Sequence, residues 1–219
     1  VTNIRETQFG KLNWGRFSHG SAMASVGLFL EPIYRRLLIP SSDGYWEAEA
    51  YGSHAFTDHL FSTSNMHVIH DGSGSSRQEK VDFIAQYPEA LDELLVCWQS
   101  LSDTNCGKCE KCMRTMIDLD LCGVLSQVPA FKHAKIDTDR ISKIYTSNTV
   151  AGIPLYYEQM LSSASDKGRE DLVKPLKTCL KRSKRYEKIF RLFARLKKLP
   201  FCYRVTNFVE QSIRQSLIY

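Results

Sequence analysis

The feature that most constrains this chain is a cluster of cysteines. Four of its seven cysteines lie within sixteen positions, in the spacing C-x8-C-x2-C-x2-C: Cys97, Cys106, Cys109 and Cys112. Four thiolates satisfy the tetrahedral preference of Zn²⁺ and leave no open position, so the pattern predicts one structural zinc ion rather than a catalytic one. Two alternatives stay open, namely an iron–sulfur cluster and a set of buried free cysteines around a turn.

The residues between the cysteines support this interpretation. Gly107 permits a tight turn that brings Cys106 and Cys109 to one metal. Cys109 and Cys112 stand three residues apart and are expected on the first turn of a helix. The N-terminus of that helix, with three nearby cations, would partly offset the two negative charges of a zinc tetrathiolate centre. These cations are Lys108, Lys111 and Arg114.

Length and composition describe an ordinary globular chain. It has 219 residues, of which 43% are hydrophobic and 24% charged, which excludes a wholly disordered or collagen-like protein. Near the start, the longest run without a charge is 17–30, well short of the roughly 20 apolar residues of a membrane span. With no secretory signal and with clustered thiols, a cytoplasmic location is expected. Because the chain begins at Val1, we also expect an N-terminally incomplete domain.

Apolar runs alternate with helical patterns in the first half of the chain. A buried helix is predicted from Ser18 up to Pro32, and buried strands over 35–40, 67–70 and 93–98. The segment 76–85 reads as a helix capped by Ser76, with Glu79 three residues on. This alternation predicts an α/β fold of the sandwich type. We assign residues 1–130 to this domain, including the zinc segment 97–112, and residues 131–219 to a helical appendage.

The appendage is strongly basic. Between Leu172 and Lys198 there are eleven lysines and arginines and one acid, a local balance of +10; since the whole chain carries +5, the remainder carries −5. We predict a linker over 162–171, a basic amphipathic helix over 172–199 and a final helical stripe over 205–217. Such a block could contact nucleic acid or anionic lipid, or leave its charges in water while its aromatic face docks on the domain.

Two loops are placed to bind a ligand, because ligands of open α/β sheets bind beyond the carboxyl ends of strands. One follows the first predicted strand and runs on to Asp58; the other begins at His70. Their serines and glycines could bind phosphate, or could simply be turn residues. His54 and Asp58 could form a local pair, and His67 is expected to be partly buried. The candidate substrate or phosphate contacts are Ser41, Asp43, Asp71, Arg77, Lys80 and, after the cysteines, Arg114.

The cysteine segment resembles a known family. A strand ending in Cys, a polar loop, then Cys-Gly-x-Cys-x-x-Cys with an Arg just beyond is similar to the zinc segment of 7-cyano-7-deazaguanine synthases, which act in queuosine biosynthesis. These are PP-loop ATP pyrophosphatases. The resemblance covers about 18–125 and implies a Rossmann-like α/β/α sandwich of the adenine nucleotide alpha hydrolase type. It also implies substrate adenylation with ATP and Mg²⁺, catalysed by a ligase or synthase.

The phosphate-binding phrase of that family, Ser-Gly-Gly-x-Asp-Ser, does not occur here; the nearest phrase is Ser18-His19-Gly20-Ser21. Arg114 follows the last cysteine by two positions instead of three. We therefore expect the C-terminal, zinc-bearing portion of a divergent adenylating enzyme, with ATP and an unspecified small molecule as substrates and a second copy of the chain as a candidate partner. The alternative is a non-enzymatic, zinc-stabilised binding module whose helix 172–199 contacts nucleic acid.

Overall fold

The computed structural model describes residues 12–46, 51–97, 99, 104–131, 135–146, 153–199 and 203–217. The chain divides into two compact units, one of residues 1–77 with 150–152 and the other of residues 78–149 with 153–219. We call them the strand unit and the helical unit. The chain is thus a mixed α/β protein in which helix predominates. In its described part, no helix combines the length and the apolar character needed to cross a bilayer.

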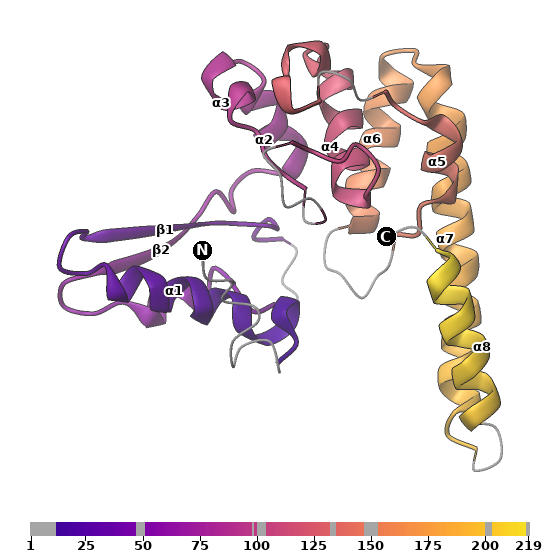
Figure 1. Ribbon diagram of the computed structural model, residues 1–219, viewed down its shortest axis with the longest axis horizontal. Coiled ribbons are helices and arrows are strands. Elements are labelled where there is room, and N and C mark those ends of the chain that lie inside the picture. The colour runs from indigo at the N-terminus through magenta and orange to yellow at the C-terminus, as the bar shows by residue number, and fades with distance from the viewer. Residues whose placement is uncertain are drawn as a thin grey trace. The chain divides into compact units, whose positions relative to one another are not determined.

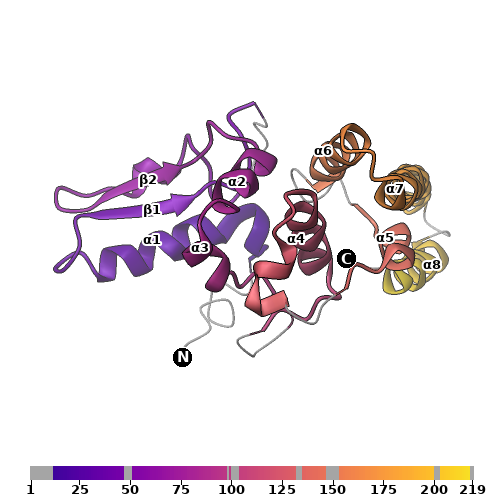
Figure 2. The same cartoon turned by 90° about the horizontal axis from the view of Figure 1, so that it is seen from above.

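The strand unit is built on two parallel strands, β1 (Arg36–Pro40) and β2 (His67–Asp71), which pair from Arg36 with His67 to Pro40 with Asp71. Helix α1 (His19–Phe29) runs along one side of the pair (Figures 1 and 2). Its buried positions are small, and at Gly27 a Cβ atom would lie 2.5 Å from the Leu37 side chain. Small residues therefore let the helix lie close against β1.

Side chains alternate along the strands as the pleat requires. Ile39 and Val68 are buried with Met66 in a core under α1, whereas the paired Leu38 and Ile69 are exposed on the opposite face. The helix and first two strands predicted from the sequence are confirmed. The expectation that His67 is partly buried is wrong, because His67 shares the exposed face.

The third predicted strand is not formed by the residues that the structure describes between 93 and 97. Leu94–Cys97 is irregular, and its backbone polar groups bond to a side chain instead of to a neighbouring strand. Asn105 Oδ1 accepts from the N–H groups of Val96 and Cys97, at 2.9 and 3.0 Å, and Asn105 Nδ2 donates to the Leu94 carbonyl at 2.9 Å. The sheet in the described residues accordingly has two strands.

The helical unit contains seven α-helices in its described residues, the first of which starts at the boundary with the strand unit. They are α2 (Arg77–Ile84), α3 (Pro88–Asp92), α4 (Glu110–Leu121), α5 (Thr138–Lys143), α6 (Ile153–Asp166), α7 (Glu170–Leu196) and α8 (Tyr203–Ser216). The main core lies between α4, α5, α6 and the first half of α7, and α8 lies along the second half of α7 (Figure 1). The start of α2 directly after Ser76 and the helices over 172–199 and 205–217 confirm the sequence prediction.

Two expectations about organisation differ from the structure. The predicted linker over 162–171 is wrong, because α6 continues to Asp166 and α7 begins at Glu170 after a turn in which Gly168 has φ of +65°. The division between units lies near residue 77 instead of residue 130. The reason is that α4, which carries two of the cluster cysteines at its start, packs against α6: buried Glu110 accepts a hydrogen bond from Tyr157 Oη at 3.3 Å.

Candidate metal centre and strand-end pocket

The four clustered cysteines meet in space. The sulfur atoms of Cys97, Cys106, Cys109 and Cys112 all lie within 4.8 Å of one another, close enough to bind one metal ion. A tetrahedron with Zn–S bonds of about 2.3 Å places its sulfurs about 3.8 Å apart, and the Sγ atoms of Cys106 and Cys112 are 3.8 Å apart. The donor set, its number and its spacing fit a closed tetrahedral site.

The local backbone builds this arrangement. Gly107 has φ of +64°, a conformation that glycine adopts without strain, so the chain turns back between Cys106 and Cys109. Cys109 is the N-cap residue of α4, and its sulfur accepts from the N–H of Cys112 at 3.5 Å. The N–H groups of Lys108 and Cys109 point to the Cys106 sulfur at 3.4 and 3.3 Å. These donors stabilise thiolate charge.

Burial acts in the opposite direction. It raises the pKa of the Cys109 thiol above its usual value and that of Cys112 well above it. Cys106 adds to the rise in the pKa of both thiols, and Cys109 adds to that of Cys112, whereas the hydrogen bonds from Cys112 lower the pKa of Cys109. Without a metal, the protonated thiol is therefore the favoured form at neutral pH. A metal ion would displace these protons and bind the thiolates, which couples metal binding to pH.

Two side chains that the sequence analysis did not identify hold this centre. Asn105, through the bonds described above, fixes the backbone at Cys97, the only ligand outside the turn and the start of α4. Arg140, from α5, donates from Nε to the Lys108 carbonyl at 2.6 Å. Both side chains bond to backbone groups that lie well away from them in the sequence, so the spacing of the cysteines did not predict these contacts.

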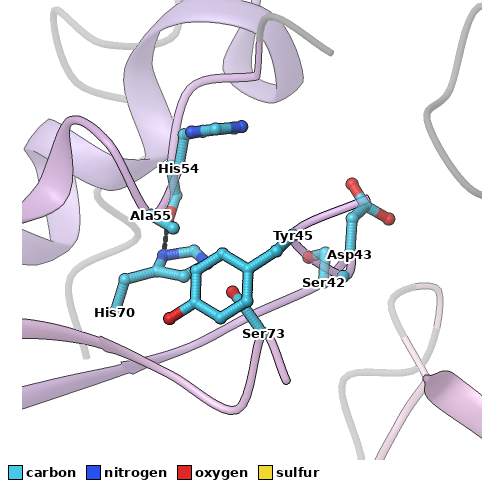
Figure 3. Close-up of a pocket in the computed structure, with 9 residues that line it drawn as sticks. Ser42, Asp43, Tyr45, His54, Ala55, His70 and Ser73 are labelled. Atoms are coloured by element: carbon cyan, nitrogen blue, oxygen red, sulfur yellow. Dashed lines mark hydrogen bonds between the residues drawn. The ribbon is translucent and has the colours of Figure 1, made fainter. Parts of the chain in front are cut away.

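A small, open pocket lies at the carboxyl ends of β1 and β2 (Figure 3). Two backbone bonds join the strand ends around it, from Ser41 N–H to the Asp71 carbonyl at 2.7 Å and from Tyr45 N–H to the Ser73 carbonyl at 3.0 Å. Its lining is rich in hydroxyl groups and imidazoles and contains no lysine or arginine among the described residues. The lining residues are Ser42, Asp43, Gly44, Tyr45, Ser53, His54, Ala55, His70 and Ser73.

A buried carboxylate supports one wall of the pocket. Asp58 is fully buried and accepts from Ser53 Oγ at 2.6 Å and from the His54 N–H at 3.0 Å. Its Oδ2 lies 2.7 Å from His70 Nδ1. This contact favours the tautomer with hydrogen on Nδ1, which leaves Nε2 as a proton acceptor. Asp58 and His70 thus form a carboxylate–imidazole pair, a common arrangement of a general base.

The predicted contact residues have different positions. Asp43 lines the pocket, whereas Ser41 is buried beside it and Asp71 is exposed at the end of β2. Arg77 is not among the lining residues. Lys80 and Arg114 belong to the helical unit, where Arg114 is buried between Glu110, 3.3 Å from its Nε, and the ring of Tyr156.

The predicted local pair of His54 and Asp58 forms through the backbone N–H of His54 and not through its imidazole. Its Nδ1 instead accepts a hydrogen bond from the Phe56 N–H at 3.1 Å, and Asp58 reaches His70 on β2. The sequence placed the two loops at the strand ends but missed this pairing, because a contact between residues 58 and 70 has no local pattern.

Comparison of the chain with protein-family models, with curated proteins and with solved structures gave no match. Function is therefore inferred from the chemistry of the two sites.

Proposed function

We propose that this chain is the zinc-bearing portion of a PP-loop-type, ATP-dependent adenylating enzyme related to 7-cyano-7-deazaguanine synthase. The observation that carries the proposal is the four-cysteine cluster, whose sulfurs lie within 4.8 Å and whose last two members open a helix. This is the arrangement that the resembling segment would need. The pocket at the strand ends supports it, since that edge of a parallel sheet is where α/β proteins bind ligands.

In this proposal zinc is structural. Cys97, Cys106, Cys109 and Cys112 would hold it with no position left for substrate. The ion would join the irregular segment before Cys97 to the turn at Gly107 and to α4, which in turn packs on α6. A reduced, cytoplasmic location fits an uncrosslinked thiol cluster of this kind.

The strand-end pocket would hold the part of the substrate that is not phosphate. Its lining offers hydroxyls, the Asp43 carboxylate and the His70 imidazole, and no cationic side chain to neutralise a phosphate. A hydroxyl- or amine-bearing group matches these partners. His70, oriented by Asp58, would accept a proton from that hydroxyl or amine, either when the group is activated by ATP or when it attacks an adenylate. ATP and Mg²⁺ would then bind elsewhere in the complete enzyme.

The Rossmann-like sandwich is part of the proposal. Two parallel strands with α1 on one face would be a portion of such a sheet. The opposite face presents Leu38 and Ile69, which would be covered by the second helical layer of a three-layer sandwich.

The metal is tested by elemental analysis of protein purified without added metal. We expect close to one zinc per chain, and loss of it in Cys109→Ser. Cys122→Ser is the matched control, because Cys122 caps the other end of α4 and lies outside the cluster. Folded protein that contains no metal, or iron in place of zinc, would contradict the zinc assignment.

The activity is tested on the protein encoded by the complete open reading frame, by measuring pyrophosphate release from ATP in the presence of candidate hydroxyl and amine substrates. We expect His70→Gln to reduce the rate by about 100-fold, in the range of general-base effects, and His67→Gln, an exposed histidine of the same strand, to leave it unchanged. A zinc-loaded protein that never releases pyrophosphate would favour the non-enzymatic binding module instead.

A further inference from the structure

Helices α7 and α8 form an antiparallel hairpin that is held together through polar and aromatic contacts. Glu210 of α8 lies 2.9 Å from Nζ of Lys197, the residue that caps the C-terminus of α7, and 2.7 Å from Arg214 Nε. The Arg214 guanidinium stacks over the Phe190 ring at 4.1 Å. The side chains on the face of α8 that is turned toward α7 therefore already have partners within the hairpin. The other face of α8 is available to contact another surface.

That other face is apolar. On α8, Val205, Phe208 and Val209 follow helical spacing and are exposed, Phe208 to 72% and Val205 to 67%. On α7 and the turn after it, Leu192 and Leu199 are also exposed by more than half. We call residues 188–199 and 203–209 the hairpin end (Figure 1). A soluble surface rarely carries so many exposed large apolar side chains within one short hairpin.

The same hairpin end is basic. Lys188, Arg191, Arg195 and Lys198 are all exposed there, and Lys188, Leu192 and Arg195 share one side of α7 by their spacing. The two acids that flank the hairpin end are used internally, since Glu187 accepts from Tyr145 Oη at 2.5 Å and Glu210 is paired as described. The outward charge is thus almost entirely positive.

From this combination we propose that the hairpin end binds the surface of an anionic lipid bilayer. Its apolar side chains would enter the boundary between headgroups and acyl chains, and its lysines and arginines would contact lipid phosphates. The proposal is independent of the adenylating function, because it involves neither the cysteine cluster nor the strand-end pocket.

Other occupants fit the observations less well. Nucleic acid would satisfy the cations and could stack on Tyr203 or Phe208. It would leave the aliphatic Val205, Leu192 and Leu199 exposed to water and phosphate. A second copy of the chain would cover the apolar residues but would bring two +10 segments together, which is electrostatically unfavourable. An anionic bilayer satisfies both features at once.

The test is co-sedimentation of the zinc-loaded full chain with vesicles at physiological ionic strength. Vesicles of equal parts phosphatidylcholine and phosphatidylglycerol are compared with vesicles of phosphatidylcholine alone. We expect binding to the anionic vesicles only, reduced about tenfold in Phe208→Ser and about tenfold to thirtyfold in the double variant Arg195→Gln/Lys198→Gln.

Two matched controls locate the effect. Phe83→Ser removes another exposed phenylalanine, on α2, and Lys174→Gln/Lys177→Gln removes the same charge from the start of α7. Both are expected to bind like the unaltered chain. Because all the substituted side chains are exposed, thermal unfolding should be unaffected. If Phe208→Ser fails this check, Val205→Ser takes its place.

Three results would overturn the proposal. The first is absence of binding, or equal loss in the control variants. The second is tighter binding to a single-stranded RNA oligonucleotide, measured by fluorescence anisotropy, that Phe208→Ser leaves unchanged. The third is a lipid-free dimer in sedimentation velocity that Phe208→Ser dissociates, which would assign the apolar face to a second copy.

Discussion

Asn105 is the residue whose replacement tests most directly how this metal centre is built. It is buried, to 8% exposure, and forms three hydrogen bonds with the segment that ends at Cys97. Cys106, Cys109 and Cys112 are placed by one turn and one helix start, whereas Cys97 arrives from a separate, irregular segment. We predict that Asn105→Ala weakens both the stability of the helical unit and its affinity for zinc.

The magnitude follows from the three bonds. Each buried hydrogen bond contributes about 1 kcal/mol, so losing all three lowers the free energy of unfolding by about 3 kcal/mol. The N–H groups of Val96 and Cys97 are left without an acceptor, so the decrease in the free energy of unfolding should be at least this large. Zinc affinity should fall about 10- to 100-fold, the usual effect of removing a group that orients a metal ligand. Asn105→Asp keeps the acceptor for both N–H groups and should retain part of the stability.

The assay has two parts. Urea unfolding of the zinc-loaded chain, followed by circular dichroism, gives the free energy of unfolding for each variant. Competition with a chromogenic chelator gives the zinc dissociation constant under native conditions. Asn65→Ala, a substitution at an exposed asparagine of the strand unit, is the matched control and should change neither quantity.

Two outcomes would refute the reasoning. If Asn105→Ala leaves both quantities unchanged, the bonds to Val96 and Cys97 do not hold the segment in solution. If the variant is destabilised but binds zinc as tightly as the unaltered chain, Cys97 is positioned without Asn105, and the link between this side chain and the metal is wrong.

Three further predictions address other parts of the molecule. Zinc affinity should fall as the pH is lowered, because protons compete with the metal for the thiols. Burial raises the pKa of these thiols, most strongly that of Cys112. Chelator competition between about pH 6 and 8 measures the effect. Asp58→Ala should lower the free energy of unfolding by about 3 kcal/mol or more, since it leaves Ser53, the His54 N–H and His70 without their buried acceptor. Asp58→Asn should lower the free energy of unfolding by less. Urea unfolding measures both variants, and equal stability of the two would contradict this prediction. Burial raises the pKa of the Cys179 thiol to about 12, so Cys179 should resist alkylation in the folded chain; peptide mass spectrometry after iodoacetamide treatment, with and without urea, tests this reactivity. The contribution of Cys179 to stability should be lost as the pH rises from the ordinary thiol range toward about 12, because the unfolded chain releases this proton first.

The metal cluster was predictable because most of it is local. Three of its ligands lie within seven residues, and the requirements of that turn are visible as Gly107 and as a helix pattern after Cys109. The helices over 172–199 and 205–217 were predictable for a similar reason, since their apolar periodicity is contained in the segment itself.

The errors occur where a distant side chain competes with a local preference. Residues 93–98 have the apolar run of a buried strand, but the Asn105 amide provides the hydrogen bonds that a neighbouring strand would otherwise supply. Residues 162–166 have the serine-rich composition of a linker, but Ala164 is fully buried in the main core, so α6 continues through them. Composition describes what a segment can do alone, and packing decided both cases.

The pocket shows the same limit at a functional site. The two loops were identified because they follow apolar runs, and this is a local signal. What makes the pocket chemically specific is the contact of Asp58 with His70, which joins a loop to the end of β2 across twelve residues of sequence. The spacing of the cysteines therefore predicts the candidate metal centre, whereas the pocket becomes a candidate catalytic site only when the fold brings a buried carboxylate to an imidazole. The cysteine cluster, which is mostly local, is therefore predictable from the sequence, whereas the pairing at the pocket, which depends on a distant contact, is not.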